Sequence, residues 1–396
     1  MPNTRDLNRA RVFEVIHLFE PISRAEVAQH VGLSSAAVSY IVAELLDLGF
    51  IEELGRRASV RGQPAIDLGV AANSAYTLGM HFNHERIRGV VVDLKGNIIR
   101  DTLHELPESP SPELVLDTLI GVGTELKRAV PDKTLLGAGL ASVGPINLIE
   151  GCVTQTAFTR GWHNVSLRQP LADVLMLPVC MDNNATATAI GEYWYGVGRD
   201  YDSFLHISFF GNGLGGGLFL NRRVYRGSGL NAAEFGHMLI HAESASPSVQ
   251  PFLENYVSGY ALKRDLGNEI LNEFPARLAA ADPALLTWLE SASSLLAKAI
   301  VSVDHLLDID AIIVGGELPE SLLTELVARV RDQLAELYMP GWSQPLNVRQ
   351  SQNCSDAAVL GAATLPIYDA FALSAQTGAT DNSLIKSNAR RDMNMQ

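Results

Sequence analysis

The chain has 396 residues, a formal net charge of −14 and 47% hydrophobic residues. This length exceeds one ordinary core and predicts two or three domains, while the acidic balance argues against a protein that coats nucleic acid or an anionic membrane. No run of roughly 18 apolar residues appears and the amino terminus lacks an apolar leader, so we expect a cytoplasmic protein without a membrane segment. The three cysteines, Cys152, Cys180 and Cys354, are far apart and predict neither a disulfide framework nor a zinc cluster.

The first 50 residues predict three helices. Residues 5–19 have the apolar spacing of an amphipathic helix, and Ser23 with Glu26 forms a capping-box pattern for a second helix that stops at Gly32. Ser34 caps a longer third helix, whose buried stripe is Val38, Ile41, Val42, Leu45 and Leu46. Two short helices joined by a tight glycine turn are typical of the helix-turn-helix motif.

The outward face of the third helix and the hairpin after it carry the predicted contacts with an operator in double-stranded DNA. Small and polar side chains can approach base edges in the major groove, and arginines on a wing can contact phosphates or the minor groove. The predicted DNA-binding residues are Ser34, Ser35, Ala36, Ser39 and Tyr40 on the helix and Arg56, Arg57 and Arg61 on the wing.

An alternative is a small helical domain that binds other proteins, because residues 1–66 hold 7 Arg against 8 Asp or Glu. The clustering of the arginines on the wing favours DNA.

From Tyr76 onward, strand patterns alternate with helix patterns, which predicts a mixed α/β fold. A hairpin signal stands at Lys95-Gly96-Asn97. The expected long helices are 112–130, 185–195, 259–271, 283–307 and 318–337, followed by a last helix from near Asp356.

Three polar clusters lie among small and apolar residues in the second half of the chain. They are DNNATATAIGE (182–192), GNGLGGG (211–217) and NAAEFGH (231–237), and Glu254 follows them. Carboxylate, amide and imidazole groups in such surroundings suit a small polyhydroxylated ligand, because each hydroxyl both donates and accepts a hydrogen bond.

The order of these motifs, with GPIN, RGWHNVSL, YRGSGLNAAEFGHM, LENYVSG, AIIVGGE and DAAVLGAA, resembles the ROK family of sugar-responsive repressors and sugar kinases over nearly the whole chain. The resemblance implies an N-terminal winged helix-turn-helix and a two-lobed α/β domain of the actin-like, hexokinase-like (ribonuclease H-like) kind, with the sugar between the lobes. The implied domains are 1–72 for DNA binding, 73–182 with about 366–376 for the first lobe, 183–365 for the second lobe with the sugar site and an oligomerisation surface, and 377–396 as a disordered tail.

Two departures from the family's kinases predict that the protein is not an enzyme and uses no nucleotide cofactor. The kinases have an Asp and a Gly-Gly-Thr turn for phosphate, where this sequence has His81 and Asn83-His84-Glu85. Their catalytic base aligns with Asn184, whose amide cannot accept a proton as a carboxylate does. A slip of the alignment by a residue or two would return Asp182 to that position. The resemblance therefore implies no catalytic residue.

Sugar contacts look better preserved. The implied sugar-binding residues are Asn183, Asn184, Glu234, His237 and Glu254. A buried histidine bonded to a backbone carbonyl is the alternative for His237. The segment after His237 lacks the cysteines with which many family members build a zinc site, so we expect no metal.

The resulting hypothesis is a transcription regulator, a repressor of carbohydrate-utilisation genes. It would bind its operator as a homodimer or homotetramer, and a sugar or sugar phosphate would control its affinity. The alternatives are an ATP-dependent sugar kinase with a DNA-binding domain, and a regulator with a vestigial cleft that a protein partner controls.

Overall fold

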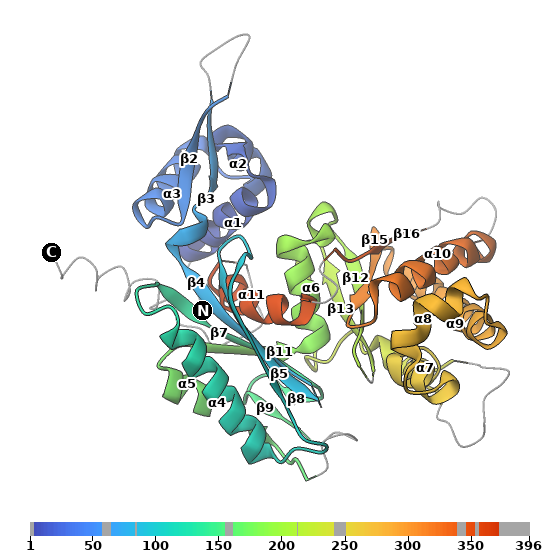
Figure 1. The fold of residues 1–396 in the computed structure, drawn as a ribbon. Coiled ribbons are helices and arrows are strands. Elements are labelled where there is room, and N and C mark those ends of the chain that lie inside the picture. Colours follow the sequence, from blue (N-terminus) through green and yellow to red (C-terminus); the bar gives the residue numbers. More distant parts are fainter. Residues whose placement is uncertain are drawn as a thin grey trace. The chain divides into compact units, whose positions relative to one another are not determined.

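The structure of the protein is a computed structural model (Figure 1), which describes residues 4–57, 65–83, 85–154, 161–211, 213–240, 251–338, 346–352 and 356–371. Arg61, His84, Cys354 and the expected tail 377–396 lie outside these ranges. The chain forms two compact units, one of Met1–Asn184 with the chain from Val359 onward, the other of Ala185–Ala358. Both units contain helices and a mixed sheet, so the predicted mixed α/β class is confirmed.

Three helices and a three-stranded sheet make the amino-terminal part of the first unit. Its elements are α1 (Thr4–Phe19), β1 (Ile22–Ser23), α2 (Arg24–Val31), α3 (Ser35–Asp47), β2 (Ile51–Arg56) and β3 (Ile66–Val70). The predicted capping box is present: the amide of Ser23 donates to Glu26 at 2.8 Å, and the amide of Glu26 donates to the Ser23 hydroxyl at 3.4 Å. Gly32 ends α2 with φ 67°, a conformation that favours glycine. The strand order β1-β3-β2 makes the hairpin a wing beside the helices (Figure 1).

The rest of the first unit is built on a five-stranded sheet of order β11-β7-β4-β5-β6. β4 pairs in parallel with β7, and β7 with β11, so these strands need covering layers on both faces. The elements are η1 (Ala72–Ser74), β4 (Tyr76–Phe82), β5 (Arg86–Asp93), β6 (Ile98–Glu105), α4 (Pro112–Arg128), β7 (Leu135–Ser142), α5 (Arg168–Leu175), β11 (Val179–Asn183) and α11 (Ala357–Phe371), with a small sheet of β8 (Ile146–Asn147), β9 (Cys152–Val153) and β10 (Val165–Ser166).

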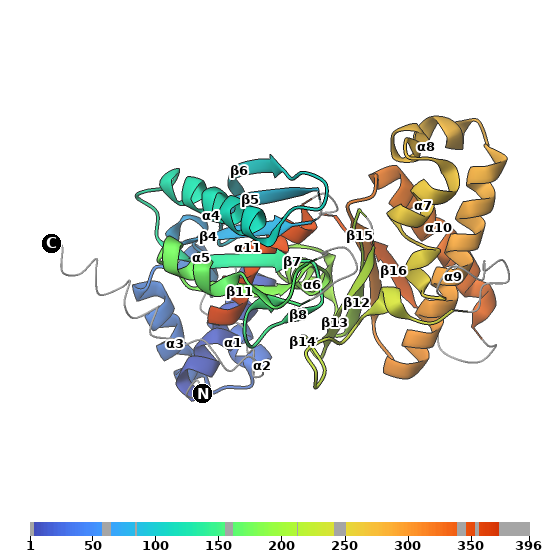
Figure 2. The ribbon, with the colours of Figure 1, turned by 90° about the horizontal axis from the view of Figure 1, so that it is seen from below.

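Glycines let helices approach this sheet closely on both faces (Figure 2). On one face a Cβ at Gly139 would overlap the carbonyl oxygen of Ala362, and a Cβ at Gly79 would lie 2.7 Å from the amide of Ala363, so α11 packs directly on the backbone of β4 and β7. On the other face Gly89 leaves room for the side chains of α4. Thr77 donates a hydrogen bond of 2.7 Å to the Ala363 carbonyl, which fixes α11 along β4.

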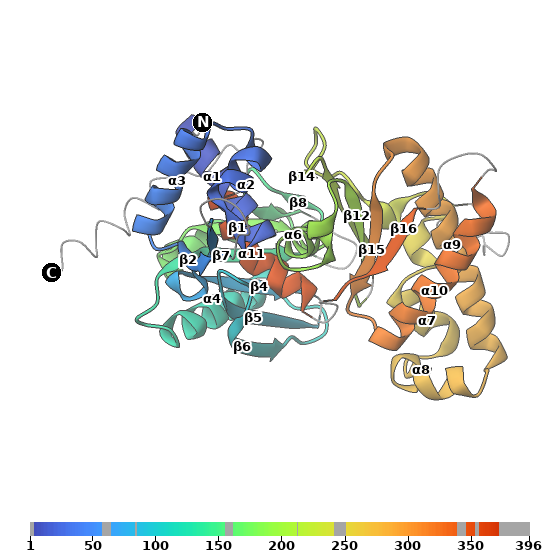
Figure 3. The ribbon, with the colours of Figure 1, turned by 90° about the horizontal axis from the view of Figure 1, so that it is seen from above.

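The second unit holds a sheet of order β14-β13-β12-β15-β16. Helices α7 to α10 cover one face (Figure 3), where Ile207, Ile312 and Val314 share a hydrophobic core with Leu289 and Leu326. The elements are α6 (Asn184–Tyr195), η2 (Val197–Asp200), β12 (Phe204–Phe209), β13 (Leu214–Leu220), β14 (Arg223–Tyr225), η3 (Phe235–His237), η4 (Leu253–Asn255), α7 (Gly259–Leu266), α8 (Ile270–Ala279), α9 (Pro283–Leu307), β15 (Ala311–Gly316), α10 (Glu320–Leu337) and β16 (Asn347–Gln350).

The expected single helix 259–271 is wrong. Gly267 adopts φ 100°, which lies outside the helical region, and its amide closes α7 by donating to the Lys263 carbonyl. The chain then turns and begins α8 at Ile270.

Helix α9 is long and apolar enough to cross a membrane by length and composition, with a mean hydropathy of 1.3 over its most apolar window. More than half of that window is buried within the protein, and Leu285, Leu296 and Ile300 belong to the core of the second unit. We therefore interpret α9 as a core helix.

The close approach of α11 predicts that Gly139→Ala is strongly destabilising. The added Cβ must displace the backbone of α11 at Ala362, so we expect the free energy of unfolding to fall by about 3 kcal/mol or more. Gly121 is the control, because it is exposed in α4 with no atom near its Cβ position. Gly121→Ala should raise stability by about 0.5–1 kcal/mol. Urea unfolding measures both, and equal effects would contradict the packing of α11.

A buried carboxyl in α6 predicts a pH dependence of stability. Glu192 is 1% exposed and accepts hydrogen bonds from the Ser351 hydroxyl and the Val197 amide, but burial dominates and raises its pKa. The unfolded chain ionises this group near its ordinary pKa of 4.5 while the folded chain keeps the proton. Stability should therefore fall as pH rises from 4.5 to the folded pKa, by about 1.4 kcal/mol per pH unit.

Glu192→Gln should remove this slope, and urea unfolding at pH 5 and pH 8 tests it. The exposed Glu336 of α10 supplies the control variant Glu336→Gln, which should keep the slope of the wild type. Identical pH profiles for Glu192→Gln and the wild type would refute the assignment.

Candidate functional site

The outward face of α3 displays the side chains that the sequence predicted for DNA. Ser34, Ser35, Ala36, Ser39 and Tyr40 are all exposed, and Tyr40 is 61% exposed. The hydroxyl of Ser34 accepts the Ala37 amide at 3.2 Å and so caps α3. The Ser34 hydroxyl is therefore used to cap the helix, whereas the other four side chains have no part in capping it.

An ion-pair network fixes α3 on α1. Arg9, which is 5% exposed, donates to Glu44 at 2.7 Å, and Arg5 donates to the other oxygen of Glu44 at 3.1 Å. Burial raises the pKa of Glu44, but the hydrogen bonds from Arg9 and Arg5 outweigh it and hold this pKa below its usual value. Arg5 also donates to the Tyr40 hydroxyl at 3.1 Å, and its guanidinium carbon lies 5.3 Å from the centre of the Tyr40 ring.

Arg5 was not among the predicted DNA-binding residues, although it places a guanidinium beside Tyr40, the aromatic residue of α3. The signal was present in the four-residue spacing of Arg5 and Arg9, which places both on one face of a helix. Their partner Glu44 lies far away in sequence.

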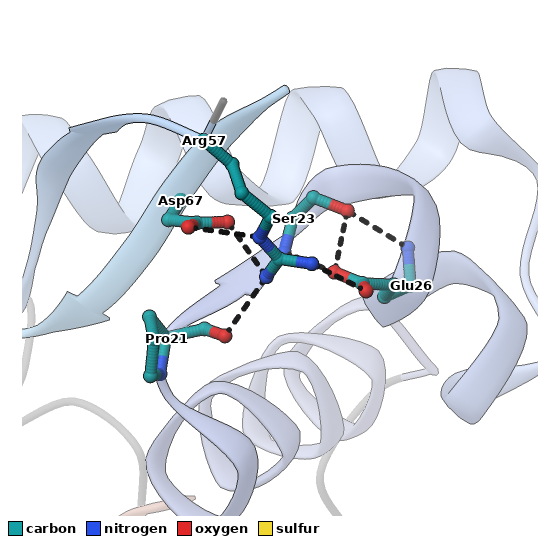
Figure 4. Close-up of polar contacts among 5 residues, drawn as sticks. All are labelled: Pro21, Ser23, Glu26, Arg57 and Asp67. Atoms are coloured by element: carbon teal, nitrogen blue, oxygen red, sulfur yellow. Dashed lines mark hydrogen bonds and ion pairs between the residues drawn. The ribbon is translucent and has the colours of Figure 1, made fainter. Parts of the chain in front are cut away.

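On the wing, Arg56 and Arg57 occupy different environments. Arg56 is exposed at the end of β2. Arg57 turns toward its own domain (Figure 4), where it donates to Glu26 at 2.9 Å and to Asp67 at 3.1 Å. The third predicted wing arginine, Arg61, lies outside the described residues.

In the second unit, two carboxylates flank one imidazole. His237 Nδ1 lies 3.5 Å from an oxygen of Glu234, and His237 Nε2 lies 3.3 Å from an oxygen of Glu254. Burial, opposed by His237 and aided by the charge of Glu254, raises the pKa of Glu234. The His237 side chain is 56% exposed, so the alternative of a buried histidine does not apply. The cluster presents carboxylate and imidazole groups to solvent at hydrogen-bonding distances from one another.

Close backbone packing positions this cluster. A Cβ at Gly236 would overlap the carbonyl oxygen of Leu214, and a Cβ at Gly216 would overlap that of Ala233, so both glycines are needed for η3 to lie on β13. The amide of Leu214 also donates to Glu254 at 3.4 Å.

Backbone hydrogen bonds hold the two chain segments that carry His237 and Glu254. The Leu253 amide donates to the Met238 carbonyl, and the Ile240 amide donates to the Pro251 carbonyl, both at 2.9 Å. The cluster thus keeps its geometry through main-chain pairing.

The other two predicted sugar-binding residues belong to the first unit. Asn183 ends β11 and Asn184 begins α6, where Asn184 is 7% exposed. The amide of Asn183 donates to the Asp182 carboxylate at 2.9 Å. The structure therefore brings Glu234, His237 and Glu254 together within one unit and describes the two asparagines in the other.

By the family resemblance, the β4–β5 turn takes the place of the kinases' phosphate turn and the glycine loop 211–217 that of a segment near the nucleotide, and in both some backbone amides already have acceptors within the protein. In the β4–β5 turn, Asn83 Oδ1 accepts the amides of Glu85 and Arg86, both at 3.0 Å. At the glycine loop, Glu317 accepts the Gly211 amide at 3.1 Å. Backbone amides bind phosphate only when they are available to it, so these side chains compete with an anion for the donors.

Comparison with known proteins gives two family matches. The model of the ROK family matches residues 77–368, and a model of the winged helix-turn-helix DNA-binding domain matches residues 20–52. The first match covers most of the two α/β lobes, and the second covers α2, α3 and the start of β2.

Among relatives, the xylose repressor of Bacillus subtilis (strain 168) is 29% identical over 268 residues, which cover 66% of this chain and 68% of that protein. A glucokinase of Streptomyces coelicolor is 30% identical over 48% of this chain and 58% of its own. The crystal structure of a ROK family transcriptional regulator, a homologue of the E. coli MLC protein, has a TM-score of 0.76 at 23% identity and covers 96% of this chain and 99% of its own. This likeness confirms the predicted arrangement of a helix-turn-helix followed by two hexokinase-like lobes.

The exposure of Tyr40 predicts that it contributes to DNA binding. We expect Tyr40→Ala to weaken binding about tenfold, the size of one lost specific base contact. The measurement is a titration of the duplex that the wild-type protein enriches most strongly from a random-sequence library. Tyr225→Ala, which removes a 47% exposed tyrosine from β14, is the control and should bind as the wild type does. Wild-type affinity for Tyr40→Ala would remove Tyr40 from the DNA-binding surface.

Proposed function

Because the chain belongs to the ROK family, we propose that it represses carbohydrate-utilisation genes and that a sugar controls its affinity for an operator. The observation that most supports this is the cluster of the exposed Glu234 and His237 with the half-buried Glu254, in a chain that also holds a winged helix-turn-helix. Two carboxylates and an imidazole can accept and donate to the hydroxyls of one sugar. The B. subtilis relative, named a xylose repressor, supports a sugar as the effector.

We infer that the protein binds the sugar and does not transfer a phosphate to it. Asn83 and Glu317 engage amides that a nucleotide phosphate would use, and Glu317 adds a negative charge beside the glycine loop. Asn184 stands where the kinases have their catalytic base. These features favour a regulator over a kinase, although a glucokinase is among the relatives.

Contacts within the first unit link the base of the wing to the first lobe. Glu20 accepts the Val70 amide at the base of the wing at 2.6 Å, and its other oxygen lies 3.0 Å from the ammonium of Lys95 in the β5–β6 turn. The Leu94 amide donates to the Ala72 carbonyl in the connecting segment at 3.1 Å. A sugar that prefers one lobe arrangement by about 1–3 kcal/mol would change operator affinity several-fold to a hundredfold.

We expect the protein to act in the cytoplasm as a homodimer or homotetramer. Paired recognition helices in a symmetric assembly would read two half-sites related by two-fold symmetry.

The test is a panel of pentoses, hexoses, amino sugars and their phosphates, added without nucleotide while thermal unfolding is followed. One sugar should raise the melting temperature, since a ligand at a hundredfold excess over its dissociation constant stabilises the native state by about 2.7 kcal/mol. Glu234→Gln should abolish the shift, and the same sugar should release the enriched duplex from the wild type. Glu336→Gln, on the exposed face of α10, is the control that should retain both responses.

Two results would contradict this proposal. Release of the duplex by the sugar from Glu234→Gln, as from the wild type, would mean that the cluster is not the sensor. Absence of any shift across the panel would favour control by a protein partner.

A further inference from the structure

The guanidinium of Arg57 joins three segments of the DNA-binding domain (Figure 4). Its Nη1 donates to Glu26 at 2.9 Å, its Nη2 donates to the Pro21 carbonyl at 3.2 Å and lies 2.8 Å from Asp67, and its Nε donates to Asp67 at 3.1 Å. Each of the three guanidinium nitrogens thus has an acceptor in the protein. The Asp67 carboxylate thus meets the guanidinium through one hydrogen bond to Nε and one ion-pair contact with Nη2, and these two contacts restrict the orientation of the side chain.

These partners lie at positions that define the domain's geometry. Glu26 is the capping-box residue of α2, and Pro21 directly precedes β1. Asp67 lies on β3, where it pairs with Ser23 of β1 and with Gly55 of β2. Arg57 itself stands where β2 leaves the sheet, and its amide donates to the Ala65 carbonyl at 2.9 Å. A single side chain therefore fixes the exit of the wing against the start of the helix-turn-helix.

The charge around Arg57 does not suit a phosphate ligand. One arginine with two carboxylates gives a local sum of +1 − 2 = −1 within 3.1 Å of the guanidinium. A DNA phosphate would have to compete with both carboxylates and would meet their repulsion. Arg56, the preceding residue, is exposed, and among the described residues no carboxylate pairs with it.

We propose that Arg57 is a positioning residue, which fixes the end of β2 against α2 and β3 so that Arg56 faces DNA. This role deepens the proposed function and rests on DNA binding by this domain. This role predicts that removal of the Asp67 charge weakens DNA binding, whereas removing an acidic group near DNA normally strengthens binding.

The deciding variant is therefore Asp67→Asn, measured with the enriched duplex. A positioning role predicts about tenfold weaker binding, similar to the loss of one specific contact. The control is Glu52→Gln, which removes the same charge from the exposed face of β2 and should bind equally well or more tightly. If Asp67→Asn binds as tightly as Glu52→Gln or the wild type, the proposal is wrong.

Two arginine variants separate positioning from phosphate contact. Arg57→Lys keeps the charge but cannot bridge Glu26 and Asp67 as a fork, so it should weaken binding as much as Arg57→Gln does. The slope of the logarithm of the binding constant against the logarithm of the salt concentration should be unchanged in Arg57→Gln. In Arg56→Gln this slope should become smaller in magnitude by about 0.9, the value for one lost phosphate contact. Wild-type binding by Arg57→Lys, or a slope reduced in Arg57→Gln, would assign Arg57 to phosphate.

A readout without DNA distinguishes failure of the positioning role from failure of the proposed function. Hydrogen exchange of β2 and β3 amides should accelerate in Arg57→Gln and Asp67→Asn, while α1 amides stay protected and report a folded domain. If the wild type enriches no duplex, the proposed function fails and the exchange data still decide the role of Arg57. Unchanged exchange in both variants would overturn it.

Discussion

Close backbone packing at glycine is the constraint on which both units depend. In the first unit, Gly139 lets α11 lie directly on β7, and in the second, a Cβ at Gly217 would lie 2.5 Å from the side chain of Ala189 in α6. The same constraint builds the polar cluster, because Gly216 and Gly236 bring η3 onto β13 and thereby place His237 beside Glu254. The glycine-rich segment 211–217 thus has a structural role here that does not require a nucleotide.

Several arginines of the DNA-binding domain form ion pairs within the domain. Arg9 and Arg57 are each held by two carboxylates, and Arg5 shares Glu44 with Arg9. A domain with this balance gains little from general attraction to DNA, so its affinity must rest on the shape of the wing and the side chains of α3. The overall charge of −14 has the same consequence, since it disfavours binding to arbitrary sequences.

Local signals were readable from the sequence, whereas interactions between distant residues were not. The capping box was predicted correctly, because its two residues, Ser23 and Glu26, lie only three positions apart in the sequence. The break at Gly267 was missed because the apolar pattern continues across it, although a glycine between two periodic segments is a signal for a helix end. Arg57 meets Glu26 across 31 positions, and no periodicity reports such a pair. The residue types in 231–237 and Glu254 indicated a site for a polyhydroxylated ligand, but only the family resemblance selected Glu234, His237 and Glu254, because main-chain pairing of two separate segments brings the third residue to the other two.

Side chains that accept hydrogen bonds from loop amides bear on the proposed role of the protein as a sugar sensor. A turn that leaves amides unpaired requires an anion or water to satisfy them. Asn83 supplies an acceptor for two such amides from within its own turn, and Glu317 supplies one for Gly211. These three amides therefore have acceptors without a nucleotide. Under the proposed function, the response to the sugar would therefore not depend on the ATP concentration.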